Sequence, residues 1–86
     1  MKIYYSTLFE EKVQALDYRL KKVLRKKLEL MAQDINYPSL RIKKIQGTAH
    51  LFEASITRGC RMTWQHYKDG ILLRNIGEHD ETLKNP

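Results

Sequence analysis

Apolar side chains in the first half of the chain recur every three or four residues, the spacing of one face of an α-helix. The repeat runs through Phe9, Val13, Leu16, Leu20, Val23, Leu24, Leu28 and Met31. One unbroken helix over this stretch would be about 40 Å long, longer than the body of a compact domain of this size. We therefore expect a break, with Asp17 capping the second helix. The first helix is expected to start at Thr7, because Glu10 follows at the spacing of a capping box.

A short strand is predicted before the helices, and a turn is predicted after them. Residues 1–5 are rich in strand-forming side chains and lead directly into the first helix. The helical region should end at residues 36–39, because Pro38 disfavours helical dihedrals at Tyr37.

The second half of the chain alternates apolar and polar positions with a period of two, which is typical of strands. Residues 51–57 and 60–67 form one predicted hairpin around Arg58-Gly59, and Asp69-Gly70 is a turn signal into residues 71–76. The order βααβββ predicts a single α+β domain over residues 1–86, with a four-stranded, largely antiparallel sheet and both helices on one face. The apolar set on the covered face is Phe52, Ile56, Met62 and Trp64, beneath Leu20, Leu24, Leu28 and Met31. The polar set expected on the open face is Glu53, Ser55, Arg61, Thr63 and Gln65.

Composition narrows the class of protein. The only cysteine among the 86 residues is Cys60, so neither an internal disulfide nor a cysteine-based zinc site is available. No apolar run approaches the ~20 residues of a membrane span, and the first residues lack the apolar stretch of a signal peptide. We expect a cytoplasmic protein with no membrane partner.

The positive charge is concentrated in one segment. The formal net charge is +6, and residues 17–44 hold nine Lys and Arg against three Asp and Glu, while each flanking segment sums to zero. Such a surface favours a polyanionic partner, either nucleic acid or an acidic protein; the alternative is a solvated helix face that is basic for solubility. Lys22, Lys26 and Lys43 lie off the apolar stripe and are predicted to contact phosphate as charges.

The sequence gives no support to most enzyme classes. It has no Gly-rich phosphate loop, no paired Cys or His at metal spacing and no serine nucleophile elbow. The remaining polar residues of the second half suit cleavage of RNA by its own 2′-hydroxyl, which needs proton transfer and cations but no cofactor. These residues are Lys43, Lys44, Glu53, Arg58, Arg61, His79, Asp80 and Glu81. Simpler interpretations remain, because Arg61 could only pair with Glu53 across the strands and His79 could be a loop histidine bonded to its acidic neighbours.

Three stretches in this order resemble the RelE/ParE toxin superfamily over nearly the whole chain. They are the basic segment 38–47, the strand Cys60-Arg61-Met62-Thr63-Trp64 and the ending Ile76-Gly77-Glu78-His79-Asp80. The ending is most similar to the ribosome-dependent mRNA interferase branch. The resemblance implies a toxin of a type II toxin–antitoxin pair that enters the ribosomal A site and cleaves mRNA without a metal or other cofactor, until a cognate antitoxin protein binds it.

The resemblance also implies roles for individual residues. Arg61 matches the strand arginine that stabilises the scissile phosphate, and His79 matches the acid/base histidine near the carboxyl end. Lys43 and Lys44 match the basic segment that faces RNA. With the polar set above, this gives Arg61, His79 and Glu53 as candidate catalytic residues, and Lys43, Lys44, Arg58, Lys22 and Lys26 as candidate RNA-binding residues.

One position departs from the pattern. The interferases place an aromatic residue a few positions after the histidine, and this chain has Leu83, which offers no π-face for stacking. Two alternatives therefore stay open. One is a ParE-like inhibitor of DNA gyrase without nuclease activity, and the other is an inactive homologue that only binds an antitoxin or nucleic acid.

Overall fold

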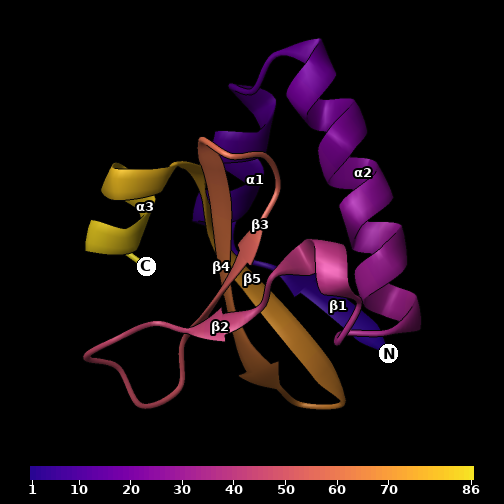
Figure 1. The fold of residues 1–86 in the computed structure, drawn as a ribbon, viewed down its shortest axis with the longest axis vertical. Helices are drawn as coiled ribbons and strands as arrows, with labels where there is room; N and C mark the ends of the chain where they lie inside the picture. Colours follow the sequence, from indigo (N-terminus) through magenta and orange to yellow (C-terminus); the bar gives the residue numbers. More distant parts are fainter.

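The chain forms a five-stranded sheet with helices on both of its faces (Figure 1). The computed structural model describes residues 1–86. The elements are β1 (Lys2–Tyr5), α1 (Thr7–Gln14), α2 (Tyr18–Gln33), the 3-10 turn η1 (Pro38–Leu40), β2 (Lys43–Lys44), β3 (Phe52–Ser55), β4 (Cys60–Tyr67), β5 (Gly70–Glu78) and α3 (His79–Lys84). The strand order is β1-β5-β4-β3-β2, with β1 parallel to β5 and the other pairs antiparallel. The α+β class is confirmed, but the sheet has five strands instead of four, because two lysines pair with β3 as a short edge strand.

The two N-terminal helices are separated where the sequence predicted. Asp17 has extended dihedrals and its carboxylate accepts the Leu20 amide at 2.8 Å, as a cap of α2 should. The cap predicted for the first helix is wrong by one residue. Ser6, and not Thr7, is extended and accepts the Phe9 amide, so Thr7 is already the first helical residue. None of the helices is both long and apolar enough to cross a membrane.

The core lies between the sheet and the first two helices, with the predicted strand residues in it. Met62, Trp64 and Ile56 are at most 2% exposed and pack in one cluster with Leu24 and Met31. The remaining members predicted for this interface, Leu20, Leu28 and Phe52, are half-buried against the same cluster. The register of the hydrophobic alternation is therefore confirmed.

The opposite face of the sheet is not open, which corrects the expectation from the sequence. Figure 1 shows α3 on the other side of the sheet from α2, where it contacts β4 and β5. The Thr63 hydroxyl donates to the Pro86 carbonyl at 3.0 Å, and the Asn75 amide donates to the Asn85 carbonyl at 2.9 Å. On this face Glu53, Ser55 and Thr63 are buried, while Arg61 and Gln65 are half-buried.

A bulge in β5 sets which side chains reach the two faces. Thr63 pairs with Asn75 and Trp64 pairs with Leu73, so Arg74 has no partner in the register. The extra residue keeps Leu73 and Ile76 on the core side although three positions separate them. It also leaves the Arg74 guanidinium on the polar face, where its Nε donates to the Pro86 carbonyl at 3.0 Å.

Candidate functional site

Strand register places the candidate site on the face opposite α1 and α2. Side chains that pair across neighbouring strands share a face. One row across the sheet is Lys43, Glu53, Thr63 and Asn75, and the next is Ser55, Arg61 and Gly77. Lys43, Glu53 and Arg61 therefore lie on the same face although 18 residues separate the first from the last.

The Arg61 guanidinium lies over the β3–β4 turn and makes contacts in two directions. Its Nη1 donates to the carbonyl oxygens of Thr57 at 2.5 Å, Arg58 at 2.8 Å and Cys60 at 3.3 Å. Its Nε lies 3.6 Å from the Glu53 carboxylate, and the two side chains are only 15% and 9% exposed. Low exposure strengthens this pair, because the surrounding protein screens charge less than water does. The guanidinium is thus a fixed cation whose orientation is set by the turn.

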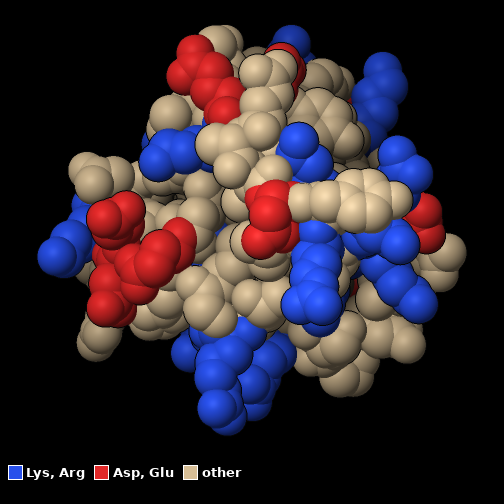
Figure 2. All heavy atoms as spheres, turned by 90° about the horizontal axis from the view of Figure 1, so that it is seen from above, with Lys and Arg blue, Asp and Glu red and all other residues tan.

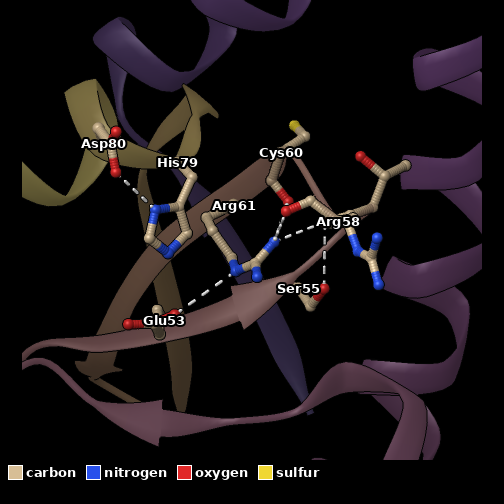
Figure 3. Close-up of polar contacts among 8 residues, drawn as sticks. Glu53, Ser55, Arg58, Cys60, Arg61, His79 and Asp80 are labelled. Atoms are coloured by element: carbon tan, nitrogen blue, oxygen red, sulfur yellow. Dashed lines mark hydrogen bonds and ion pairs between the residues drawn. The ribbon is translucent and has the colours of Figure 1, made fainter.

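His79 joins this group from the beginning of α3. Its backbone amide donates to the Gly59 carbonyl at 2.9 Å, which ties the residue to the β3–β4 turn. Its Nδ1 lies 2.9 Å from the Asp80 carboxylate, and the side chain is 41% exposed. Figure 3 shows the ring beside Arg61, with Nε2 directed away from Asp80. When Nδ1 donates to Asp80, the lone pair of a neutral imidazole lies on Nε2, which is free to accept a proton.

Cys60 is adjacent to the site but is no candidate nucleophile. Its side chain is buried, and burial raises the pKa of the thiol, although the Arg61 charge and a backbone hydrogen bond act in the opposite direction. A thiol whose pKa is raised holds little thiolate near neutral pH. Cys60 instead fills space in the core, as the sequence suggested.

Acidic side chains surround His79 at the start of α3. In Figure 2, one group of acidic atoms lies on the left, the side on which Figure 1 places α3, and other acidic atoms lie among the basic ones at the top, centre and right. Glu78, Asp80 and Glu81 form the cap and first turn of α3 and are exposed.

The remaining predicted RNA-binding residues do not join this group. Lys44 pairs with Phe52 and so belongs to the opposite face of the sheet. Arg58 is exposed in the β3–β4 turn, and Figure 3 shows its side chain turned away from His79. Lys22 and Lys26 are exposed on α2, behind the sheet, where the Lys22 ammonium lies 5.2 Å from the centre of the Tyr18 ring. Of the basic candidates, only Lys43 shares a face with Arg61 and Glu53.

Two parts of the site were missed by the sequence analysis. The first is α3, which carries both His79 and the half-buried Leu83. A signal was present, since Glu78 accepts the Glu81 amide at 2.9 Å in the manner of a helix cap and acidic residues fill the first turn. The second is the set of carbonyls that hold Arg61, and side-chain patterns carry no signal for these.

Comparison with known proteins gives structural neighbours but no sequence relative. No protein-family model and no curated protein matches the sequence. The YoeB/ParE toxin from Agrobacterium tumefaciens has a similar structure, with a TM-score of 0.77, 14% identity and coverage of 92% of this chain and 99% of that chain. YafQ from the E. coli strain BL21(DE3) has a TM-score of 0.76, 15% identity and coverage of 93% and 94%.

A chain of the archaeal RelE–RelB complex from Pyrococcus horikoshii OT3 is also similar, with a TM-score of 0.74, 13% identity and coverage of 92% and 94%. These alignments extend over nearly the whole of both chains, so they concern the complete fold and not a shared hairpin. The resemblance in fold expected from the sequence motifs is confirmed. The chain has the fold of the RelE, ParE, YoeB and YafQ toxins.

Proposed function

We propose that this protein is the toxin of a type II toxin–antitoxin pair and that it cleaves mRNA in the ribosomal A site. The single observation that carries the proposal is the convergence of Arg61 and His79 on one side of the β3–β4 turn, with Lys43 and Glu53 on the same face of the sheet as Arg61. Fixed positive charge and a proton-transfer group are the two requirements of RNA cleavage by the 2′-hydroxyl.

In the proposed reaction the ribose 2′-oxygen loses its proton and attacks the adjacent phosphorus, and the bond to the 5′-oxygen of the next nucleotide breaks. The products are a 2′,3′-cyclic phosphate and a free 5′-hydroxyl. Arg61 would stabilise the charge that develops on the phosphoryl oxygens, since its guanidinium is always protonated. Protonated His79 would donate a proton from Nε2 to the leaving 5′-oxygen while Asp80 holds Nδ1, and water would accept the 2′-hydroxyl proton.

Glu53 and Lys43 have supporting roles in this proposal. The Glu53 carboxylate lies in the sheet against Arg61 and is nearly buried, so we assign it the positioning of the guanidinium. Lys43 is exposed on the edge strand and would contact a phosphate next to the scissile one. Lys22, Lys26 and Arg58 would contribute longer-range attraction to ribosomal RNA.

The test is cleavage of a translated mRNA by the purified protein, with 5′ ends mapped by primer extension. Loss of a charge stabiliser or a general acid typically lowers the rate by ~10² to 10⁴, so Arg61→Lys and His79→Gln should both be strongly impaired. Arg61→Lys keeps the charge but loses the fork that the turn carbonyls hold. Arg19→Lys, in an exposed arginine of α2, is the matched control.

A pH profile separates the two roles. His79→Gln should flatten the dependence of the rate on pH, whereas Arg61→Lys should lower the rate at every pH, because an imidazole can exchange a proton with the substrate and a guanidinium cannot. Cleavage by His79→Gln at the full rate would contradict the proposal.

One observation favours a second function, the binding of DNA gyrase without cleavage. The Arg61 guanidinium already donates to the turn carbonyls, and Leu83 offers no stacking surface. If the purified protein arrests growth but leaves translated mRNA intact, inhibition of gyrase supercoiling in the same preparation would identify the ParE-like function.

An antitoxin partner is part of the proposal. RelB and DinJ were crystallised with structural neighbours of this chain. By analogy, a cognate antitoxin should bind this protein and suppress its toxicity when the two are expressed together. The exposed basic face of α2 favours an acidic segment in such a partner.

A further inference from the structure

A second hollow, away from Arg61 and His79, lies between a loop and the ends of two strands. It has a volume of about 500 Å³ and is lined by loop residues 48–51 together with Phe52, Gln65 and His66. The loop runs between β2 and β3 and projects at the lower left of Figure 1. A volume of this size is within the range of small-ligand sites.

The wall formed by β3 and β4 is a cluster of three aromatic rings. Phe52 and Trp64 are stacked with their centres 4.7 Å apart and an interplanar angle of 21°. His66 meets both rings edge-on, at 5.6 Å from Phe52 and 5.3 Å from Trp64. Trp64 is buried, Phe52 is half-buried and His66 is exposed, so the outer rings of the cluster face the hollow.

The loop is closed by its own hydrogen bonds. The Ile45 amide donates to the Leu51 carbonyl at 2.9 Å, and the Thr48 hydroxyl donates to the Ile45 carbonyl at 2.8 Å. A wall held in this way does not have to be ordered by the ligand, which lowers the entropic cost of binding.

Polar groups and a cation complete the hollow. His50 and His66 bring ring nitrogens, which can donate to or accept from the edge of a planar heterocycle, whereas the Gln65 amide oxygen already accepts from Arg74. Lys44 is exposed and pairs with Phe52 across β2 and β3, so its ammonium belongs to the same face as the aromatic cluster. Aromatic surface, in-plane polar groups and a neighbouring cation are the features that hold an unpaired nucleotide.

We propose that this hollow binds one unpaired base of single-stranded RNA, with Lys44 on the adjoining phosphate. The inference extends the proposed function to a second contact with RNA, on a different face from the cleavage chemistry. Binding at this hollow does not require cleavage, so the two proposals can fail separately.

Binding at the hollow can be followed through the fluorescence of Trp64. It is the only tryptophan in the chain and contacts both Phe52 and His66. Titration with a short oligoadenylate should quench its fluorescence to saturation, whereas inorganic polyphosphate, which has charge but no bases, should not. Anisotropy of a labelled oligoadenylate gives the affinity independently of the tryptophan.

Variants at the exposed rings locate the site. His66→Ala should weaken oligoadenylate binding about tenfold, because stacking is worth about 1–3 kcal/mol per base. Phe52→Leu keeps an apolar side chain in the core and should weaken binding similarly. Tyr18→Ala is the matched control, since it removes an exposed aromatic ring from the start of α2, and it should leave the affinity unchanged.

Several outcomes would overturn the inference. Equal quenching by polyphosphate would show attraction by charge alone, and an unchanged affinity in both His66→Ala and Phe52→Leu would remove the aromatic site. Saturable binding of an acidic peptide in place of RNA would identify a protein partner for the hollow. If oligoadenylate binds as described but translated mRNA is not cleaved, the proposed function fails and this inference stands.

Discussion

Arg61 makes contacts that belong to the fold as well as to the candidate site. Its guanidinium bonds the carbonyls of the β3–β4 turn and pairs with the nearly buried Glu53 carboxylate. The simplest interpretation of the sequence, an ion pair across two strands, is confirmed for the pair itself. The catalytic role of the same residue remains a prediction.

The first prediction concerns this pair. Arg61→Ala should destabilise the protein by about 3–5 kcal/mol, because it leaves a nearly buried carboxylate without its partner. Glu53→Gln should recover part of the loss in the double variant, since an amide costs less to bury than a charge. Urea unfolding of the wild type, both single variants and the double variant gives the coupling energy. Additive effects of the two substitutions would contradict the assigned pair.

The sequence predicted the sheet face of residues in long strands better than that of residues in short or irregular strands. Alternation placed Arg61 and Glu53 on one face because side-chain direction follows directly from strand periodicity. Whether Lys43 or Lys44 joins them depends on the pairing of a two-residue strand, for which the sequence carries almost no periodic signal. The same limit applies to Arg74, since one bulged residue changes the face of its neighbours.

At the scale of elements, the turn predicted at Asp69-Gly70 is present, but Gly70 has a different role from the one expected of a turn glycine. The turn residue with positive φ is Lys68, at 48°, and Gly70 already pairs with Tyr67 in the hairpin. Gly70 is needed because the neighbouring strand β1 lies very close to it. A Cβ at this position would lie 1.8 Å from the Lys2 carbonyl oxygen. The glycine therefore marks the parallel pairing of β1 with β5, which the sequence did not otherwise indicate.

The second prediction compares two glycines. Gly70→Ala should lower the free energy of unfolding by about 1–3 kcal/mol, the usual cost of overpacking, and should speed amide exchange in β1. Gly59→Ala is the matched control, because a Cβ at Gly59 meets nothing within 4 Å. It should be neutral or slightly stabilising, through a less flexible unfolded chain. Equal effects of the two substitutions would show that β1 does not pack closely against Gly70.

The third prediction concerns the hydrogen bond that joins β1 to the β4–β5 turn. The Tyr4 hydroxyl donates to the Asp69 carboxylate at 2.6 Å, which raises the pKa of Tyr4 and lowers the pKa of Asp69. Because the pKa of Asp69 is lower in the folded state, the bond stabilises the fold above the unfolded pKa, and this stability is lost as the pH falls through the folded pKa. Because the pKa of Tyr4 is raised, the matching stability is present below the unfolded pKa of the phenol and is lost as the pH rises through the folded pKa. Tyr4→Phe should therefore reduce the pH dependence of the urea midpoint between about pH 3 and 5 and above about pH 10. The two midpoint curves should run parallel near neutrality, and parallel curves at both extremes would contradict the coupling.

At the scale of the whole molecule, the sheet separates two basic surfaces. Lys43 lies on the site face, whereas Lys22 and Lys26 lie on α2 behind the sheet. The summed charge of the segment was readable from the sequence, but its division between two faces depends on tertiary structure. Ribosomal RNA is large enough to contact both faces together, whereas one short single strand would contact α2 much less than it contacts the site face or the hollow beside Lys44.

The fourth prediction follows from that division. Reversal of Lys22, Lys26 or Lys43 to Glu should lower ribosome association, and more so at low salt. With a short single-stranded RNA, Lys43→Glu should reduce the slope of log affinity against log salt by about 0.7, the loss of one phosphate contact. The α2 reversals should change that slope much less. Identical slopes for all three variants would mean that the strand is not bound along the site face.

The pairing of β1 with β5 also has a consequence for synthesis of the chain. Lys2 pairs with Gly70, and His79 follows β5 directly, so the first strand stays unpaired and the site stays incomplete until residues 70–79 have emerged from the ribosome. Pairing between such distant segments is slow, because the intervening loop must first be closed. The group formed by Arg61, Glu53 and His79 is hence among the last parts of the molecule to be assembled during synthesis.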